Sequence, residues 1–245
     1  MLAQIFQEFI DKLIFVFKEG DRCQWIVNGL VATLKITAVS LVIGIVIGIV
    51  VAAIRSSYDK NRESMKKRGG IGYIVLSVLN SICKVYLTII RGTPVVVQLL
   101  IFYFVILASV SDGVPVAMLC FGINSGAYVA EIFRSGIMSI DEGQFEAGRS
   151  LGFNYLQTMR YIIIPQAFKT VLPTLCNEFI VLIKETSIAG YVGITDLTKA
   201  GDLIRGRTYE AFLPLLAVAI IYLVIVMILS ALVGVLERRL RRNER

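Results

Sequence analysis

Six polar side chains interrupt or border long apolar stretches of this chain and are candidates for contact with a solute. They are Thr93, Gln98, Asn124, Asn177, Glu178 and Lys184. Amide and ionisable groups are costly in an apolar environment, so they tend to face a cavity or one another. Gln98 and Asn124 can donate and accept hydrogen bonds, whereas Glu178 suits an ammonium group. Lys184 suits a carboxylate. The alternative is that these groups only bond neighbouring helices.

The overall composition is that of a membrane protein with several spans. Of the 245 residues, 56% are hydrophobic and 18% are charged, which excludes an ordinary soluble domain. Histidine is absent, so the usual general base and a favoured metal ligand are missing. The four cysteines lie far apart, mostly among apolar residues, as structural thiols do: Cys23, Cys83, Cys120 and Cys176. We therefore expect no metal site and no catalytic residue, which disfavours a membrane-embedded enzyme.

Five apolar stretches reach the ~20 residues that a bilayer crossing needs. They cover residues 26–54, 71–107, 114–132, 161–183 and 212–236. The sequence thus predicts an all-α integral membrane protein with a single transmembrane domain over residues 25–240 and a basic tail over residues 241–245. Residues 1–24 carry apolar side chains at helical spacing, which predicts an amphipathic helix at the membrane interface.

Basic residues set the expected orientation. They crowd an expected loop at residues 55–68 and the C-terminus at residues 238–245, and both should face the cytoplasm. Four crossings then separate them, which leaves the N-terminus outside and the C-terminus inside. A net charge of +7 gathered in such blocks indicates contacts with the lipid bilayer and not with nucleic acid.

Local features refine this topology. Pro94 removes a backbone donor and predicts a kink within residues 71–107. Residues 71–91 either lie along the inner face or form the lower part of one long tilted helix. Glu131 and Arg134, expected near the inner mouth, either form a structural ion pair with the polar segment at residues 137–157 or contact a solute. Two pairs of small residues predict close helix packing: Gly44 with Gly48, and Gly126 with Ala130.

A polar segment at residues 137–157 separates two of the apolar stretches and, by the orientation above, faces the cytoplasm. A short helix over about residues 138–150 would end at Gly152, where a left-handed turn suits glycine. Small residues here allow another backbone to approach, and two side chains offer charges of opposite sign. We therefore predict that this segment is held by another protein, through Glu146, Ala147, Gly148, Arg149 and Gly152.

Several motifs in order resemble the membrane subunits of binding-protein-dependent ABC importers, and specifically the polar amino acid permease group (histidine, glutamine, arginine or glutamate type). The importer signature is matched at Glu146, Ala147, Gly152, Ile162 and Pro165, with Gly148 and Ile164 as departures. The other motifs, similar to those of the group, are Asn28-Gly29-Leu30, Arg91-Gly92-Thr93-Pro94, residues 124–134, Pro165-Gln166-Ala167 and Lys184-Glu185-Thr186-Ser187.

This resemblance implies a type I importer transmembrane domain of about five helices, in the plasma membrane of a prokaryote. It implies that residues 146–165 carry a coupling helix that rests on a separate ABC ATPase, which would bind the ATP and Mg. The chain itself has no GxxxxGK[ST] phosphate-binding loop, so we expect neither enzyme activity nor a cofactor in it. An extracytoplasmic solute-binding protein, an amino acid substrate and a second transmembrane subunit are also implied.

Some alternatives stay open. The second subunit is either a second copy or a related chain, and the amino acid carried is not specified by the sequence. A stand-alone channel or secondary transporter is the competing function. Such a protein predicts internal inverted repeats or paired broken helices, and the sequence shows neither.

Overall fold

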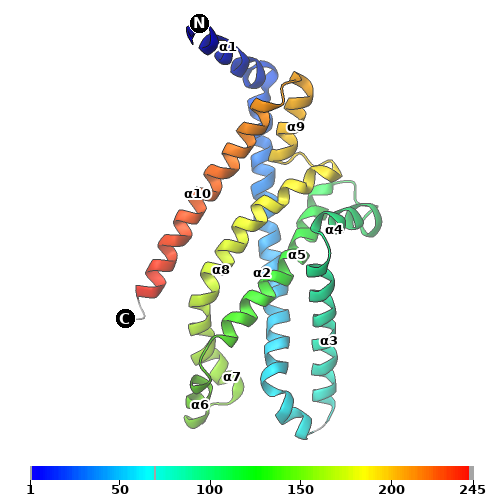
Figure 1. Cartoon of the computed structure of the whole chain (residues 1–245). Coiled ribbons are helices and arrows are strands. Elements are labelled where there is room, and N and C mark those ends of the chain that lie inside the picture. Colours follow the sequence, from blue (N-terminus) through cyan, green and yellow to red (C-terminus); the bar gives the residue numbers. More distant parts are fainter. Residues whose placement is uncertain (1, 69, 243–245) are drawn as a thin grey trace.

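Helices make up the regular structure of the chain, and the long ones run roughly along one direction (Figure 1). The structure is a computed structural model that describes residues 2–68 and 70–242. Short π-helical and 3-10 turns join the α-helices, and no strand occurs within the described residues. The predicted all-α architecture is confirmed.

The N-terminal segment forms α1 (Leu2–Leu13), and α2 (Arg22–Arg68) follows it. Between them the backbone reverses at Gly20, whose φ is 63°. The prediction of one helix over residues 1–24 was therefore wrong in extent. Val16 in this connection is fully buried against Leu197 and Ile204 of α9 (Leu197–Thr208), so the N-terminal segment is fastened to a distant part of the chain.

Helix α2 is far longer than the apolar stretch that predicted it. Its 47 residues extend about 70 Å at 1.5 Å per residue. The basic residues 55–68, expected in a loop, continue this helix, because Lys, Arg, Glu and Met are all good helix formers. The chain turns only near Gly70, whose φ is 105°. The expected loop at residues 55–68 is thus a helical extension, which we call the α2 extension.

Small residues hold α2 close to α5 (Gly113–Met138). A β-carbon added at Gly44 would lie 3.0 Å from Ser125 Oγ, and one added at Gly48 would overlap Val129 Cγ1. From the other side, a β-carbon at Gly126 would lie 2.9 Å from a side-chain atom of Ile47. The predicted close packing at these positions is confirmed, and it makes α2 and α5 the central pair of the fold.

The stretch over residues 71–107 is two helices and not one. Helix α3 (Ile71–Gly92) ends before Thr93 and Pro94, whose backbones are extended, and α4 (Val95–Ile101) continues as a π-helical turn to Ile106. A residue that precedes proline avoids the helical region, so the helix stops where a kink was expected. Helix α3 lies alongside the lower half of α2 (Figure 1), and it is long and apolar enough to cross a membrane by itself.

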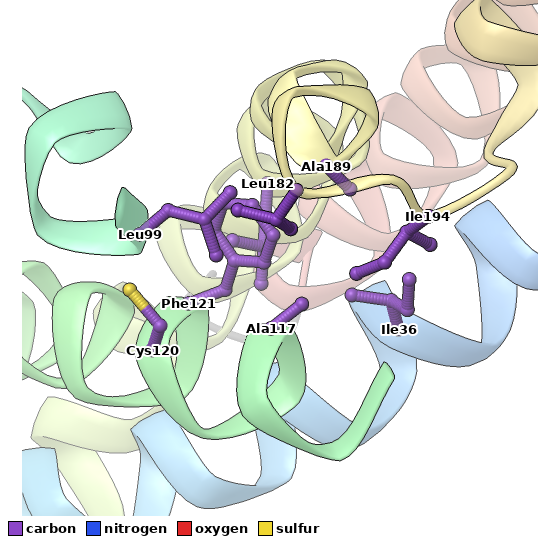
Figure 2. Close-up of a cluster of buried hydrophobic side chains, with 9 residues drawn as sticks. Ile36, Leu99, Ala117, Cys120, Phe121, Leu182, Ala189 and Ile194 are labelled. Carbon is purple, nitrogen blue, oxygen red and sulfur yellow. The ribbon is translucent and has the colours of Figure 1, made fainter. Parts of the chain in front are cut away.

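The largest buried cluster joins five segments of the chain (Figure 2). Phe121 of α5 lies at its centre, with no exposed surface, and Leu99 of α4 and Leu182 of α8 (Ile164–Glu185) pack around it. Ile36 of α2 and Ala189 also belong to the cluster. These contacts fix α4 and α8 against the central pair, which positions the polar residues beside them.

Beyond α8, a 3-10 turn (Thr186–Val192) leads to α9. Asp196 is fully buried and caps α9 by accepting hydrogen bonds from the backbone N–H groups of Thr198 and Lys199, at 3.0 and 3.1 Å. Burial raises the pKa of the Asp196 carboxyl above its usual range. The Leu197 N–H donates to Thr33 Oγ1 at 3.1 Å, so α9 is bonded to α2.

The last helix, α10 (Phe212–Arg242), contacts α9 and α8 and then diverges toward its C-terminus (Figure 1). It enters the tail predicted at residues 241–245, of which residues 243–245 lie outside the described part. Among the described residues, four segments are long and apolar enough to cross a membrane: Phe6–Lys60, Ile71–Gly92, Gly113–Met138 and Phe212–Leu240. Helix α8 has the same length as α3, 22 residues. It carries the polar residues Lys169, Asn177 and Glu178 and is not among these four segments.

Candidate functional site

Thr93 and Gln98 meet where α3 breaks. Pro94 donates no hydrogen bond, so carbonyl groups in the last turn of α3 need other partners. Thr93 Oγ1 donates to the Ile89 carbonyl at 2.8 Å, and Gln98 Nε2 donates to the Ile90 carbonyl at 2.8 Å. Gln98 Nε2 also reaches the Thr93 carbonyl and hydroxyl, at 3.1 and 2.8 Å. The Gln98 side chain therefore stabilises the backbone break between α3 and α4.

Asn124 of α5 extends this network into the centre of the fold. Its Nδ2 donates to Gln98 Oε1 at 3.0 Å, and both residues are buried, with 2% and 7% exposed. One residue further on, Ser125 Oγ donates to Glu178 Oε1 of α8 at 3.0 Å. We call Thr93, Gln98, Asn124, Ser125 and Glu178 the buried polar cluster, after its buried members Gln98, Asn124 and Ser125. Thr93 is exposed and Glu178 is half-buried.

The structure thus brings four of the six sequence-predicted solute contacts to this cluster and leaves two elsewhere. Lys184 is exposed near the end of α8. Asn177 lines a separate polar cavity of about 330 Å³ between α8 and α10, with Lys169 and Glu237. Ser125 was not among the predicted site residues. Its position next to Asn124 in a run of small residues was the only signal in the sequence.

Charged residues join three helices below the cluster. Glu131 Oε1 lies 2.8 Å from Arg134 Nη2, and Glu131 Oε2 lies 3.9 Å from Arg91 Nη1 of α3. Arg134 Nη1 lies 3.6 Å from Asp59 Oδ2 of α2. The Arg91 guanidinium also lies 5.7 Å from the ring centre of Tyr128. Glu131 and Arg134 thus pair with each other and with Arg91 and Asp59, and the ion pairs of the described residues do not join them to residues 137–157.

The second candidate region is α6 (Glu142–Ser150), at the lower end of the molecule in Figure 1. Asp141 caps its start by accepting from the Gly143 N–H at 2.7 Å. At its end the Gly152 N–H bonds the Arg149 carbonyl at 2.9 Å, and the Phe153 N–H bonds the Gly148 carbonyl at 3.0 Å. With a φ of 79° at Gly152, this is a Schellman motif. The predicted helix end at Gly152 is confirmed, although the helix begins at Glu142 and not near residue 138.

The predicted docking residues divide between two faces of α6. Gly148 faces inward, because a β-carbon there would lie 2.7 Å from the Thr158 side chain. The close approach at Gly148 is therefore made by α7 (Tyr155–Thr158) of the same chain. Glu146, Ala147, Arg149 and Gly152 are exposed, and so are the neighbouring apolar side chains Leu151 and Leu156, at 70% and 75%.

The α2 extension supports this exposed helix. Lys60 Nζ lies 2.8 Å from Glu142 Oε1 and 4.5 Å from the ring centre of Phe145. The hydrogen bond from Lys60 lowers the pKa of the Glu142 carboxyl. Phe145 itself is buried with Ile163 and Ala167, where the chain enters α8. Helix α6 thus contacts both α2 and the start of α8.

No group of three or more His, Cys, Asp or Glu that could hold a metal occurs among the residues the structure describes.

Comparisons with known proteins agree with this architecture. The model of the family described as "Binding-protein-dependent transport system inner membrane component" matches residues 71–242. The chain is 35% identical to the arginine transport system permease protein ArtQ of Bacillus subtilis, covering 90% of this chain and 94% of that protein. It is 39% identical to the glutamine transport system permease protein GlnP of Escherichia coli, covering 67% and 77%.

A solved structure gives the same result in three dimensions. A chain of an amino acid ABC transporter, crystallised with histidines, superposes with a TM-score of 0.77 at 37% identity, covering 89% of this chain and 94% of that one. The residues matched by the family model, 71–242, include α3, the buried polar cluster and α6. The chain therefore belongs to the family of inner membrane components of binding-protein-dependent transport systems.

Proposed function

We propose that this chain is the transmembrane subunit of an ATP-driven amino acid uptake system in the plasma membrane of a prokaryote. The observation that carries this proposal is the exposed helix α6. It is capped at both ends, packed through Phe145 and Gly148, and leaves Glu146, Ala147 and Arg149 free on the outer side. Such a rigid and exposed helix suits docking to a separate protein.

The partner at α6 is an ABC ATPase, which binds the ATP and Mg that this family uses. Closure of the ATPase on nucleotide would push α6, and α6 contacts the start of α8 and the α2 extension. The buried polar cluster joins α4, α5 and α8, and α2 packs against it where Gly44 meets Ser125. A displacement of α6 would therefore reach the cluster through packed helices and would switch its exposure between the two sides of the membrane.

The solute contacts in this proposal are Thr93, Gln98, Asn124 and Glu178, and Ser125 supports them through its hydrogen bond to Glu178. Their mixture of amide, hydroxyl and carboxylate groups suits an amino acid, because Glu178 can accept from an ammonium group and the amides can serve either end. The arginine and glutamine named for two relatives are the first solutes to test. Asn177 and Lys184 remain candidates for other parts of the path.

The working unit contains two transmembrane subunits, either two copies or this chain with a related one. Exposed apolar side chains on α3 and α10 support this, since they offer surface to a second subunit as well as to lipid. The N-terminus lies outside and the C-terminus inside. An extracytoplasmic solute-binding protein delivers the amino acid from the side of α9.

Uptake into proteoliposomes tests the proposal. The chain is reconstituted with its ATPase and its binding protein, and labelled amino acids are offered with and without internal ATP. We expect uptake of one class of amino acid only when ATP and the ATPase are both present. Uptake that persists without the ATPase would overturn the proposal and favour a stand-alone channel or secondary transporter.

A further inference from the structure

A cavity lined by cations lies between α2 and α3, apart from the buried polar cluster. Its volume is about 560 Å³, within the range of small-molecule sites. Its lining consists of Arg55 from α2 and of Lys84, Leu87, Thr88, Arg91 and Gly92 from α3. It thus presents three cations and a hydroxyl group, and no carboxylate lines it.

The positive charge of this cavity is only partly balanced. Glu131 lies 3.9 Å from Arg91 but is shared with Arg134, at 2.8 Å. Neither Arg55 nor Lys84 forms an ion pair with any residue that the structure describes, and the buried Nε of Arg55 has no hydrogen-bond partner. Arg55 is half-buried, and Lys84 and Arg91 are exposed, so the excess positive charge is accessible and would attract an anion.

One face of α5 links the buried polar cluster to Arg91, which lines this cavity. Asn124, Tyr128 and Glu131 follow one another at spacings of four and three residues, which places them on the same side of a helix. Asn124 contacts Gln98 at the upper end of this stripe, and Tyr128 and Glu131 contact Arg91 at the lower end. Thr93 of the cluster follows directly after Gly92 of the cavity lining.

We propose that this cavity is an oxyanion site, which holds the carboxylate of the amino acid between the buried polar cluster and the inner side. The inference rests on the proposed transport function and adds Arg55, Lys84 and Arg91 to the solute path. The phosphate of an anionic lipid offers the same chemistry. However, Arg55 lies 13 residues, or about 20 Å, from Arg68 at the end of α2, so a lipid head group at that end of the helix would meet the other basic residues first.

Ligand binding to the purified complex of this chain with its ATPase tests the site without uptake. The probes are L-arginine and L-glutamine, together with agmatine and 4-aminobutanamide, which are the same molecules without the carboxylate. Lys84→Gln removes one cation, and Lys84→Arg keeps the charge. Lys35→Gln is the matched control, because Lys35 is an exposed cation on α2 some 20 residues from Arg55 and so ~30 Å from it.

We expect Lys84→Gln to weaken binding of the carboxylate-bearing probe about tenfold, which corresponds to about 1.4 kcal/mol. Binding of its carboxylate-free counterpart should not change, and Lys84→Arg and Lys35→Gln should bind as the unmodified chain does. An equal loss for both probes, or no loss for either, would overturn the proposal. Retention of the fold is checked for every variant by its thermal unfolding midpoint.

A second arm separates the two sources of oxyanion. The complex is placed in nanodiscs of phosphatidylcholine with or without phosphatidylglycerol, and lipid that copurifies with each variant is measured. Loss of phosphatidylglycerol from Lys84→Gln with unchanged amino acid binding would assign the site to lipid and contradict the carboxylate. If the unmodified chain shows ATP-dependent uptake but Lys84→Gln binds normally, only the oxyanion site fails. If the unmodified chain shows no such uptake, the proposed function fails.

Discussion

The two candidate regions of this molecule are built in opposite ways. Helix α6 is assembled from neighbours in the sequence: Asp141 caps it, Gly152 ends it, and Thr158 closes over Gly148. The buried polar cluster is assembled from residues 26 and 53 positions apart, since Gln98 meets Asn124 and Ser125 meets Glu178. A surface that docks a partner can be made locally, whereas a solute path requires several helices to meet.

This contrast predicts that changes at α6 impair coupling and that changes in the cluster impair solute handling or stability. The strongest test at α6 is Gly152→Arg. Gly152 is exposed, with nothing within 4 Å of an added β-carbon, so the chain should fold and insert, but the arginine would obstruct docking. We expect uptake in proteoliposomes to fall at least about tenfold, or ~1.4 kcal/mol of docking free energy.

Gly152→Ala is the matched control for this variant. Both substitutions place a β-carbon at a φ of 79° and therefore carry the same backbone strain, roughly 1–2 kcal/mol. Only the arginine adds bulk on the docking side. If Gly152→Ala loses as much uptake as Gly152→Arg, backbone strain and not docking explains the effect.

Gln98→Glu tests the cluster. A carboxylate cannot donate, so the carbonyls of Ile90 and Thr93 would lose their partner while Asn124 keeps its acceptor. A buried group left unpaired costs about 1–3 kcal/mol, and we expect a lower thermal unfolding midpoint together with reduced uptake. Gln144→Glu on exposed α6 is the control, since Gln144 only accepts, from Gln166. Equal stability of the two variants would contradict the account.

Glu178→Gln separates solute binding from helix bonding. The amide oxygen can still accept from Ser125, so the unfolding midpoint should stay the same while uptake falls about tenfold, or ~1.4 kcal/mol. Ser125→Ala is the converse variant, which removes the hydrogen bond, costs about 1 kcal/mol of stability and should keep uptake. Unchanged uptake by Glu178→Gln would assign Glu178 to helix bonding alone.

Lys60→Met should have the smallest effect, because exposed ion pairs contribute little. Lys60 lowers the pKa of the Glu142 carboxyl below its ordinary value of 4.5. The Lys60–Glu142 ion pair therefore stabilises the position of α6 fully above pH 4.5, and this stabilisation is lost as the pH falls through the lowered pKa. We expect the mobility of a spin label at Ala147 to rise on such acidification in the unmodified chain. In Lys60→Met the label should be mobile at neutral pH and insensitive to acid, and a persistent acid response would exclude Lys60 as the cause.

The same contrast between local and distant contacts explains which features of each region could be predicted from the sequence. The helix end at Gly152 was predictable because a left-handed turn depends on one residue and its neighbours. The hydrogen bond from Asn124 to Gln98 was not, because it depends on the break after Gly92 and on the register of α4 against α5. The α2 extension was mistaken for a loop because its residues are polar, although the same residues favour helices. The inward orientation of Gly148 became visible only with Thr158 in place.

Photo-cross-linking at α6 tests whether this helix docks to the ATPase. A photoreactive amino acid replaces Ala147, which is exposed on α6, or Gly206, which is exposed on α9 at the other end of the molecule. The account predicts that illumination of the reconstituted complex joins the ATPase to the chain labelled at residue 147 and not to the chain labelled at residue 206. Cross-linking of the ATPase at residue 206, or an absence of cross-links at residue 147 in a complex that transports, would contradict it.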